Sequence, residues 1–308
     1  MKREIIGQGA IKVKIAAAVI CVLILLLIPC SMGMVQEAIF EMDDPVGDDY
    51  GPGTYVYPKS AEFVPGIFDL TNFKVSKTES DVVFEFKYKD LGGNPWGSNY
   101  GFSFQFQQVY IDKDGKSGSG RTDTVGANLL VDPANAWEVA ITVGPSWEGS
   151  EAQANWIIVG TTTHEWEIEV SADEVSNSVI AKVPIALIGE PTNEWVYTVI
   201  TGSWDTGHMR AIGIEAEDWL GGGADENAII AGVVPLAYDI LVPKGMDQST
   251  VLKSYDTEAE TFAVVPAVPP RTMGLLVKIL AVIIPVIVAI IVVVVVVIVV
   301  KRKKQRGR

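Results

Sequence analysis

The middle of the chain alternates between apolar and polar residues. Phe84, Phe86 and Tyr88 lie two positions apart and are separated by charged residues, and residues 102–107 repeat this period with phenylalanines. Such an alternation is typical of β-strands that bury one face. Residues 91–99, between the two segments, are rich in Gly, Asn, Pro and Ser, which indicates a turn. The pattern therefore predicts two neighbouring strands joined by a loop.

Short apolar runs predict further strands along the same region. They cover residues 137–143, 156–159, 166–170, 179–183, 195–201 and 233–242. No long segment has the period of an amphipathic helix, and one short helix is expected at 185–188 or at 215–219. Many short strands separated by Gly, Pro, Asp and Asn indicate an all-β domain, a β-sandwich, over residues 38–256.

A hydrophobic run without any alternation precedes the C-terminal residues. Residues 279–300 contain no charged or polar side chain, and the tail 301–308 is dominated by Lys and Arg. A helix that rises about 1.5 Å per residue crosses the roughly 30 Å bilayer core with such a run. Its many Val and Ile residues favour strands, but an open strand in lipid would leave backbone groups without partners. We therefore expect a transmembrane helix at 274–300, with the basic tail in the cytoplasm and the preceding part extracellular.

The first residues predict export. Basic residues precede an apolar stretch at 15–28, and small residues follow at 31 and 33. This pattern is that of a signal peptide over residues 1–33, with an uncleaved signal anchor as the alternative. A lipidated Cys30 is the weaker interpretation, because Pro29 stands where a small residue is usual. In each case the middle of the chain faces outward.

The segment between the sandwich and the membrane is expected to be a stalk. Residues 257–273 begin with acidic residues and then contain Pro266, Pro269 and Pro270. Proline favours an extended and fairly stiff chain. The domain is therefore expected to sit close above the membrane.

Composition adds a strong charge asymmetry. The chain has a net charge of −14, and every acidic residue except Glu4 lies between residues 34 and 272. Nucleic acid is bound through a cationic surface, so we do not expect it as a partner. An acidic surface favours hydration and divalent cations. Both cysteines, Cys21 and Cys30, lie in the expected signal, which leaves no disulfide for the exported part.

Two acidic motifs are candidates for binding Ca²⁺. Asp44, Asp48 and Asp49 lie in a short run of turn residues, and Asp112 and Asp114 alternate in a segment that bends at a glycine. Calcium takes about six to eight oxygen ligands, which flexible acidic loops supply. The second motif is not an EF-hand, because it lacks the third acidic ligand and the final Glu. The alternative for both motifs is an ordinary solvated turn.

Tryptophans in turn-rich segments are candidates for carbohydrate binding. Trp96, Trp147, Trp204 and Trp219 stand beside Gly, Asn, Asp or Ser, and Tyr100 follows the first of them. Flat sugar faces stack on such rings while polar groups orient the hydroxyls. The alternative is a packing role, which we expect for the tryptophans in strand-like runs: Trp137, Trp156, Trp166 and Trp195.

Catalytic chemistry has little support in the sequence. His164 and His208 are the only histidines, and no nucleophile-elbow, zinc-protease or P-loop motif occurs. A carboxylate pair could hydrolyse glycosides, but such a pair carries no information in so acidic a chain. His208 and Met209 are a conceivable haem pair, yet neighbours in a strand point to opposite faces. We therefore expect no enzyme, with a haem or redox domain as the least favoured alternative.

A set of motifs is spread over residues 44–256. They are residues 44–58, 112–115, 120–123, 126–129, 136–138, 144–147, 219–223, 239–243, 247–248 and 254–256. These motifs resemble the C-terminal binding module of glucodextranase, which also occurs on amylopullulanases. The resemblance implies a non-catalytic, DOMON-like β-sandwich, similar to carbohydrate-binding modules, associated with α-glucan-degrading enzymes and surface-layer-like anchoring.

Together these features predict a membrane-anchored extracellular protein whose β-sandwich binds carbohydrate and is stabilised by Ca²⁺. The expected ligand is an α-glucan or a glycan of the envelope. The alternative is a structural component of the cell envelope that contacts surface-layer proteins. Surface-layer proteins and a secreted glycoside hydrolase are the expected protein partners.

Overall fold

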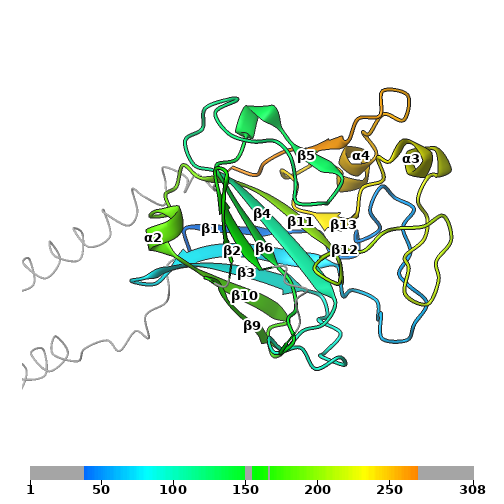
Figure 1. Cartoon of the computed structure of the whole chain (residues 1–308), viewed down its shortest axis with the longest axis horizontal. Helices are drawn as coiled ribbons and strands as arrows, with labels where there is room; N and C mark the ends of the chain where they lie inside the picture. Colours follow the sequence, from blue (N-terminus) through cyan, green and yellow to red (C-terminus); the bar gives the residue numbers. More distant parts are fainter. Residues whose placement is uncertain (1–37, 150–154, 166, 270–308) are drawn as a thin grey trace, which may run out of the picture. The chain divides into compact units, whose positions relative to one another are not determined.

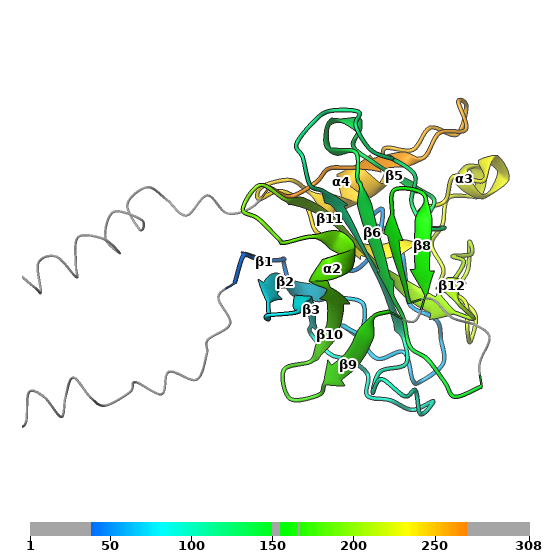
Figure 2. The ribbon, with the colours of Figure 1, turned by 60° about the vertical axis from the view of Figure 1, so that its left-hand side comes forward.

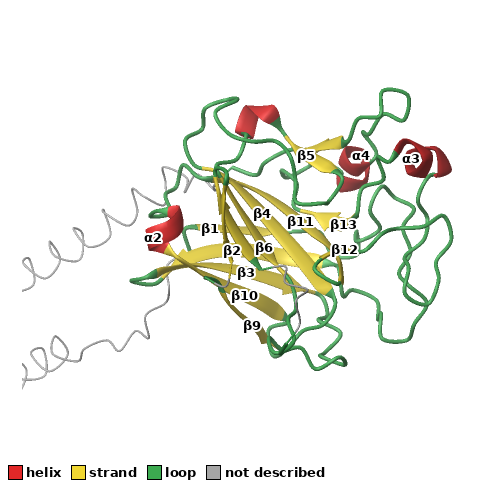
Figure 3. Cartoon of the chain, viewed as in Figure 1, coloured by secondary structure: helices red, strands yellow, loops and turns green. Residues whose placement is uncertain are grey.

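A computed structural model describes residues 38–149, 155–165 and 167–269. The expected signal segment 1–33, transmembrane helix 274–300 and basic tail 301–308 lie outside these residues. No helix within the described ranges has the length and hydropathy that a membrane span requires. Strands make up most of the described secondary structure, and the helices are short (Figure 3).

The first of two large sheets is antiparallel and has the strand order β1-β2-β3-β10-β9. Its strands are β1 (Phe40–Asp43), β2 (Leu70–Lys77), β3 (Asp81–Tyr88), β9 (Glu169–Asp173) and β10 (Ser178–Pro184). The alternation of apolar and polar residues predicted β3, and its apolar positions Phe84, Phe86 and Tyr88 are all buried. The face on which they lie is therefore the inner face of this sheet.

The second sheet has the order β12-β11-β4-β6-β7-β8, and β13 also pairs with β11. Its strands are β4 (Gln105–Asp112), β6 (Val139–Val143), β7 (Trp156–Val159), β8 (Thr162–Glu165), β11 (Val196–Asp205), β12 (His208–Met209) and β13 (Ala237–Ile240). The two sheets lie face to face, as Figures 1 and 2 show from two directions. Phe73 and Phe84 of the first sheet share one buried cluster with Val109, Ile141 and Tyr197 of the second. The predicted β-sandwich is therefore present.

The second sheet is also covered on its other face. Tyr110 and Ile200 point away from the sandwich core into a separate buried cluster with Val265 and Leu252. This cover consists of β5 (Leu129–Val131), the parallel strand β14 (Ala263–Val265) and α4 (Gln248–Leu252). The 3₁₀ helix η1 (Pro133–Asn135) follows β5 and has no buried residue. All eight residues of β4 are consequently buried.

One expectation about strand bounds is corrected, and the expected short helix is confirmed. The strand predicted from residue 102 begins at Gln105, because Ser103 is bonded to the preceding loop: its Oγ donates to Asn94 Oδ1 (2.7 Å) and accepts from Trp96 N (3.3 Å). The short helix is α2 (Ile185–Ile188), one of the two expected positions, whereas residues 215–219 form bends. A further helix, α3 (Glu226–Ala231), was not expected; Asp225 caps it by accepting from two backbone amides.

The expected stalk begins later than residue 257. Residues 263–265 form β14, which pairs with β5, and Val268 is fully buried beside Tyr197. Val268 N donates to Tyr197 O at 2.7 Å, and Tyr197 N donates back at 3.1 Å. Alternate burial of Val residues, rather than the prolines, therefore decides the structure of this segment. Residues 270–273 lie outside the described ranges.

Candidate functional site

Two long loops lie together at one end of the sandwich (Figure 1, blue and olive segments). The first is the β1–β2 loop, residues 44–69, and the second is the β12–α3 loop, residues 210–225. Val56 and Gly222 exchange two backbone hydrogen bonds of 3.0 Å, and Lys59 N donates to Glu217 O at 2.8 Å. The two loops are therefore joined by their backbones rather than by apolar contact alone.

A tight approach at Gly223 fixes how closely the loops meet. Its φ is +93°, and a Cβ added there would collide with the backbone carbonyl of Thr54. The Thr54 hydroxyl donates to Gly223 O at 2.6 Å. A side chain at this position would push the loops apart, so the contact requires glycine.

The four tryptophans predicted from turn-rich segments come together beside these loops. Trp96 and Trp219 have ring centroids 5.9 Å apart, and Trp147 and Trp204 have centroids 4.7 Å apart. The two pairs are joined because Trp147 Nε1 donates to Trp96 O at 2.7 Å. We call these four residues the aromatic cluster. Four segments that are distant in sequence thus contribute to one aromatic surface.

Exposure differs sharply among the four rings. Trp219 is 47% exposed, Trp96 and Trp147 are half-buried, and Trp204 is buried. A ring that is half accessible on a rigid base can stack on a ligand without unfolding its surroundings. Trp219 is therefore the member best placed to meet a ligand, and Trp204 supports the cluster from beneath.

Phe63 supports the aromatic cluster from the β1–β2 loop. Its ring lies 6.1 Å from Trp96, 5.8 Å from Trp219 and 5.2 Å from Phe104. The side chain is buried. The sequence offers no signal for this role, since a lone Phe in an irregular loop belongs to no periodic pattern.

Arg210 holds the backbone carbonyls of two residues of the aromatic cluster in place. Its Nη1 donates to Trp219 O (2.9 Å), its Nη2 donates to Trp204 O (3.0 Å), and its Nε donates to Ser203 Oγ (3.3 Å). A charged donor makes stronger hydrogen bonds than a neutral one. Asp205 Oδ2 lies 3.6 Å from the guanidinium. Arg210 is therefore a positioning residue that the sequence alone did not reveal.

Tyr100 does not join the aromatic cluster. Its ring packs against the core between the two large sheets, and its carbonyl accepts from Ala172 N at 2.7 Å. Trp137 and Trp195 are buried, as expected for core residues, and Trp156 is half-buried. Trp166 lies outside the described residues.

The first acidic motif folds into a buried group of carboxylates. Asp44, Asp48 and Asp239 each place a carboxylate oxygen within 4.8 Å of the others. Asp69 lies beside them, and Asp44, Asp69 and Asp239 are buried. We call these four residues the acidic cluster. The sequence indicated Asp44 and Asp48; Asp69 and Asp239 stand alone in apolar strand-like segments and were not predicted.

Burial and mutual repulsion make these carboxyls hard to ionise. Burial, followed by the nearby charge of Asp48, raises the pKa of Asp44 to about 8. Burial raises the pKa of Asp48 to about 6, and it raises the pKa of Asp239 well above its usual range. The nearest cation that the structure records is Lys89, whose Nζ lies 3.7 Å from Asp69 Oδ2. One lysine at the edge leaves most of the charge unbalanced.

Asp49 is turned to a different partner. The hydroxyl of Tyr57 donates to its Oδ2, and Tyr57 in turn accepts from Phe68 N at 3.1 Å. Burial raises the pKa of Asp49 to about 6. The three predicted carboxylates of this motif are therefore split, with Asp44 and Asp48 in the acidic cluster and Asp49 outside it.

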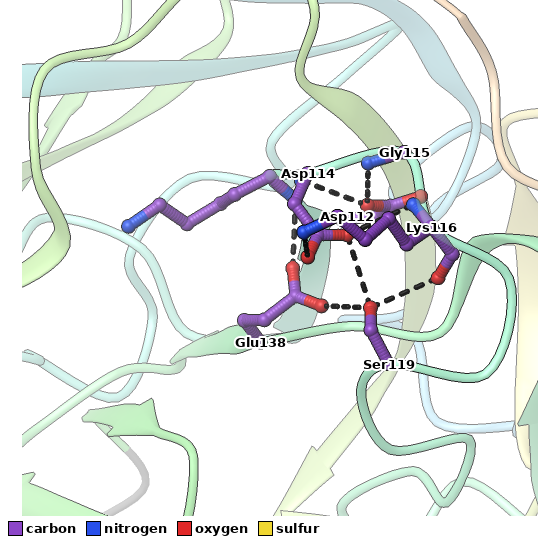
Figure 4. Close-up of polar contacts among 7 residues, drawn as sticks. Asp112, Asp114, Gly115, Lys116, Ser119 and Glu138 are labelled. Carbon is purple, nitrogen blue, oxygen red and sulfur yellow. Dashed lines mark hydrogen bonds and ion pairs between the residues drawn. The ribbon is translucent and has the colours of Figure 1, made fainter.

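The second acidic motif folds back on itself (Figure 4). Asp112 Oδ1 accepts from the backbone amides of Asp114 (3.1 Å) and Gly115 (2.7 Å), and Asp114 accepts from Ser119 Oγ and Lys116 N. Glu138 comes within 4.8 Å of these two acids and accepts from Ser119 Oγ and Lys113 N. The carboxylates of this loop therefore already have partners within the chain.

A hollow on the outer face of the first sheet is unrelated to either cluster. Charged residues of β1, β2 and β3 line it, among them Lys74 and Glu85, whose charged atoms lie 3.7 Å apart.

His208 is exposed and Met209 is buried on the adjacent position of β12, so the two side chains do not converge.

The comparisons with known families agree with this architecture. A family model described as the SLH-like C-terminal binding module of glucodextranase matches residues 39–267. The chain belongs to this family. The match confirms the resemblance found in the sequence and extends it to residue 267, so that the glucodextranase-type module reaches β14. Three motifs of the resemblance, 44–58, 219–223 and 239–243, meet at the loop end of the module.

The other comparisons identify no ligand and no binding residue for the module. No curated protein matches the chain. A family 9 carbohydrate-binding module from Caldicellulosiruptor kristjanssonii, in complex with cellotriose, is 10% identical with a TM-score of 0.25. The alignment covers 53% of this chain and 72% of that chain. A likeness at this distance transfers neither a binding residue nor a ligand to the glucodextranase-type module.

Proposed function

We propose that this protein is a non-catalytic, membrane-anchored surface protein whose module binds carbohydrate through the aromatic cluster. The observation that carries the proposal is the convergence of Trp96, Trp147, Trp204 and Trp219 on one surface with Trp219 half exposed. Aromatic faces of this kind stack on the apolar faces of sugar rings. Membership in the family of the C-terminal binding module of glucodextranase supports the same function, and an α-glucan or an envelope glycan is the proposed ligand class.

The first test is affinity electrophoresis of the full chain in mild detergent, in gels that contain starch, pullulan or dextran. Retardation in at least one gel is expected. Trp219→Ala should raise the dissociation constant obtained from the retardation at least about tenfold, which corresponds to the loss of one strong contact. Because Trp219 is half exposed, its removal should leave the melting temperature nearly unchanged.

Tyr100→Ala is the matched control. This aromatic residue also lies in a loop but packs away from the aromatic cluster, so the variant should be retarded like the wild type. Migration of the wild-type chain without retardation in all three gels would contradict binding of α-glucans. Equal loss in Trp219→Ala and Tyr100→Ala would contradict the assignment of the site to the aromatic cluster.

The second candidate function is a structural role in the cell envelope. The SLH-like character of the family model favours it. In that case the full chain should co-sediment with isolated cell envelopes while it remains unretarded in all glucan gels. Trp219→Ala in the sedimentation assay would then show whether the same aromatic surface makes the envelope contact.

A further inference from the structure

The acidic cluster contains buried oxygen atoms to which no group of the described chain, other than the carboxyls of the cluster itself, offers a hydrogen bond. They are Asp44 Oδ1 and Oδ2, Asp48 Oδ1, Asp69 Oδ1 and Asp239 Oδ1. Asp44 is 6% exposed, and Asp69 and Asp239 are 0% exposed. A buried carboxylate without a partner is strongly destabilising, because it loses its hydration and gains nothing in return. Several of them at one point call for a common positive partner.

We propose that the acidic cluster is a Ca²⁺ site, with Asp44, Asp48 and Asp239 as ligands and Asp69 as a fourth carboxylate beside them. The ligands come from the start of the β1–β2 loop and from β13. A bound ion would therefore fasten the loop to the second sheet. This inference does not depend on whether the module binds carbohydrate.

The second oxygens of two carboxylates are already fixed by the backbone. Gly47 N donates to Asp69 Oδ2 at 2.8 Å, and Leu70 N donates to Asp239 Oδ2 at 2.7 Å. Each bond leaves the other oxygen, Oδ1, free and oriented. Outer hydrogen bonds of this type hold the ligands of metal sites in place. The arrangement is that of a site whose ligands are pre-oriented before an ion binds.

The ligand chemistry favours calcium over other cations. The cluster offers only carboxylate oxygens, with no His or Cys among its members, which excludes the donor sets that soft metals prefer. Calcium accepts irregular sets of oxygen ligands from flexible loops, whereas magnesium demands a near-octahedral set and retains its water. The divalent charge would also offset the repulsion among four carboxylates better than Lys89 does from the edge.

Contacts connect this site to the aromatic cluster. Phe68 precedes Asp69 and stacks on Tyr238, which precedes Asp239, with ring centroids 4.6 Å apart. Phe68 also lies 6.4 Å from Phe63, which packs on Trp96 and Trp219. Loss of the ion should therefore loosen the base of the aromatic cluster.

The metal-free full chain, kept in detergent, is titrated with CaCl₂ in a calorimeter. The metal bound to the chain is then measured after dialysis. About one equivalent per chain is expected. At a free calcium concentration about 1,000 times the Kd, calcium should raise the melting temperature by roughly 10 °C. Asp44→Asn and Asp239→Asn should each abolish the shift. Asp112→Asn combined with Asp114→Asn is the matched control and should keep it, since those carboxylates have partners within their own loop.

A crossover in stability separates a metal ligand from a merely structural aspartate. In EDTA, Asp44→Asn should melt no lower than the wild type, because the amide replaces a buried carboxyl that no cation balances. In calcium it should melt lower than the wild type. Tryptophan emission of the wild type should shift on calcium addition, and that of Asp239→Asn should not.

Three results would overturn the proposal. The first is a wild-type chain that binds no calcium and melts alike in calcium and EDTA, which would mean that Asp44 and Asp239 share a proton instead. The second is a calcium shift that survives in Asp44→Asn and Asp239→Asn but disappears in the Asp112 and Asp114 variant. The third is an equal shift with MgCl₂ at the same concentration.

Discussion

At the scale of single residues, the aromatic cluster depends on side chains that carry no sugar-binding signature themselves. Arg210 donates hydrogen bonds to the carbonyls of Trp204 and Trp219, and the ring of Phe63 packs against both Trp96 and Trp219. Exposed rings gain binding free energy only if their orientation is fixed before the ligand arrives. If the aromatic cluster is the proposed binding surface, substitution of these supports should weaken binding as substitution of Trp219 does.

Gly223 gives a residue-scale prediction about the two loops. Gly223→Ala places a methyl group against the Thr54 carbonyl, and Gly232→Ala places one in open space, although both glycines have positive φ (+93° and +71°). Both variants incur the conformational cost of a left-handed residue, about 1–2 kcal/mol. Gly223→Ala should lose at least about 1 kcal/mol more, because the loops must separate. Urea unfolding of both variants measures the difference; equal losses would show that the loop contact is not tight.

At the scale of elements, the second sheet is the structural centre of the module. It is buried on the sandwich side by the first sheet and on the other side by β5, β14 and α4. Strands buried on both faces lose the apolar–polar alternation that reveals strands in a sequence. β4 shows the effect, since its glutamines and aspartate are as buried as its valine and isoleucine.

β14 gives an element-scale prediction about where the fold ends. Val265 is fully buried between β5 and α4, whereas its neighbour Val264 is 39% exposed. Val265→Ala should lower the free energy of unfolding by roughly 2 kcal/mol. Val264→Ala should change it by less than about 0.5 kcal/mol. If both were neutral in urea unfolding, this segment would act as a stalk after all.

At the scale of the whole molecule, the proposed arrangement is a module held outside the cell by one membrane span. The support comes from the apolar run 279–300, the basic tail 301–308 and the acidic character of residues 34–272. With β14 and Val268 part of the fold, few residues remain between the module and the run. The proposed anchor therefore keeps the module close to the membrane.

The anchor gives a prediction for intact cells and vesicles. Alkaline carbonate and high salt should leave the chain in the membrane fraction, because a spanning helix is released only by detergent. Protease added to intact cells should remove the module and spare the basic tail. A chain released by salt, or a tail cleaved from outside, would contradict the proposed topology.

Apolar runs and alternation predicted most of the longer strands, including β6 and β11, which are buried on both faces, but they missed β2. β3, β7 and β10 follow from apolar runs or alternation, and so does α2. β5 and β14 are three residues each, too short for a period to be visible. The four candidate tryptophans were recognised by residue type, although Trp204 lies in strand β11 and not in a loop. Their meeting depends on the paths of loops and strands that no local pattern encodes.

The sequence by itself determined the β class, the family, the acidic character and the positions of the apolar segments, because these follow from residue type and short-range spacing. Only the tertiary structure decided which aspartates share a buried point and which tryptophans share a surface. Asp44 and Asp239 are almost two hundred positions apart, and a β-sandwich brings such positions together through strand pairing that depends on the whole core. Asp112, Asp114 and Glu138 also lie close enough to hold an ion, but their oxygens accept hydrogen bonds from neighbouring residues of the chain. Burial and the absence of donors, rather than spacing, distinguish the two motifs.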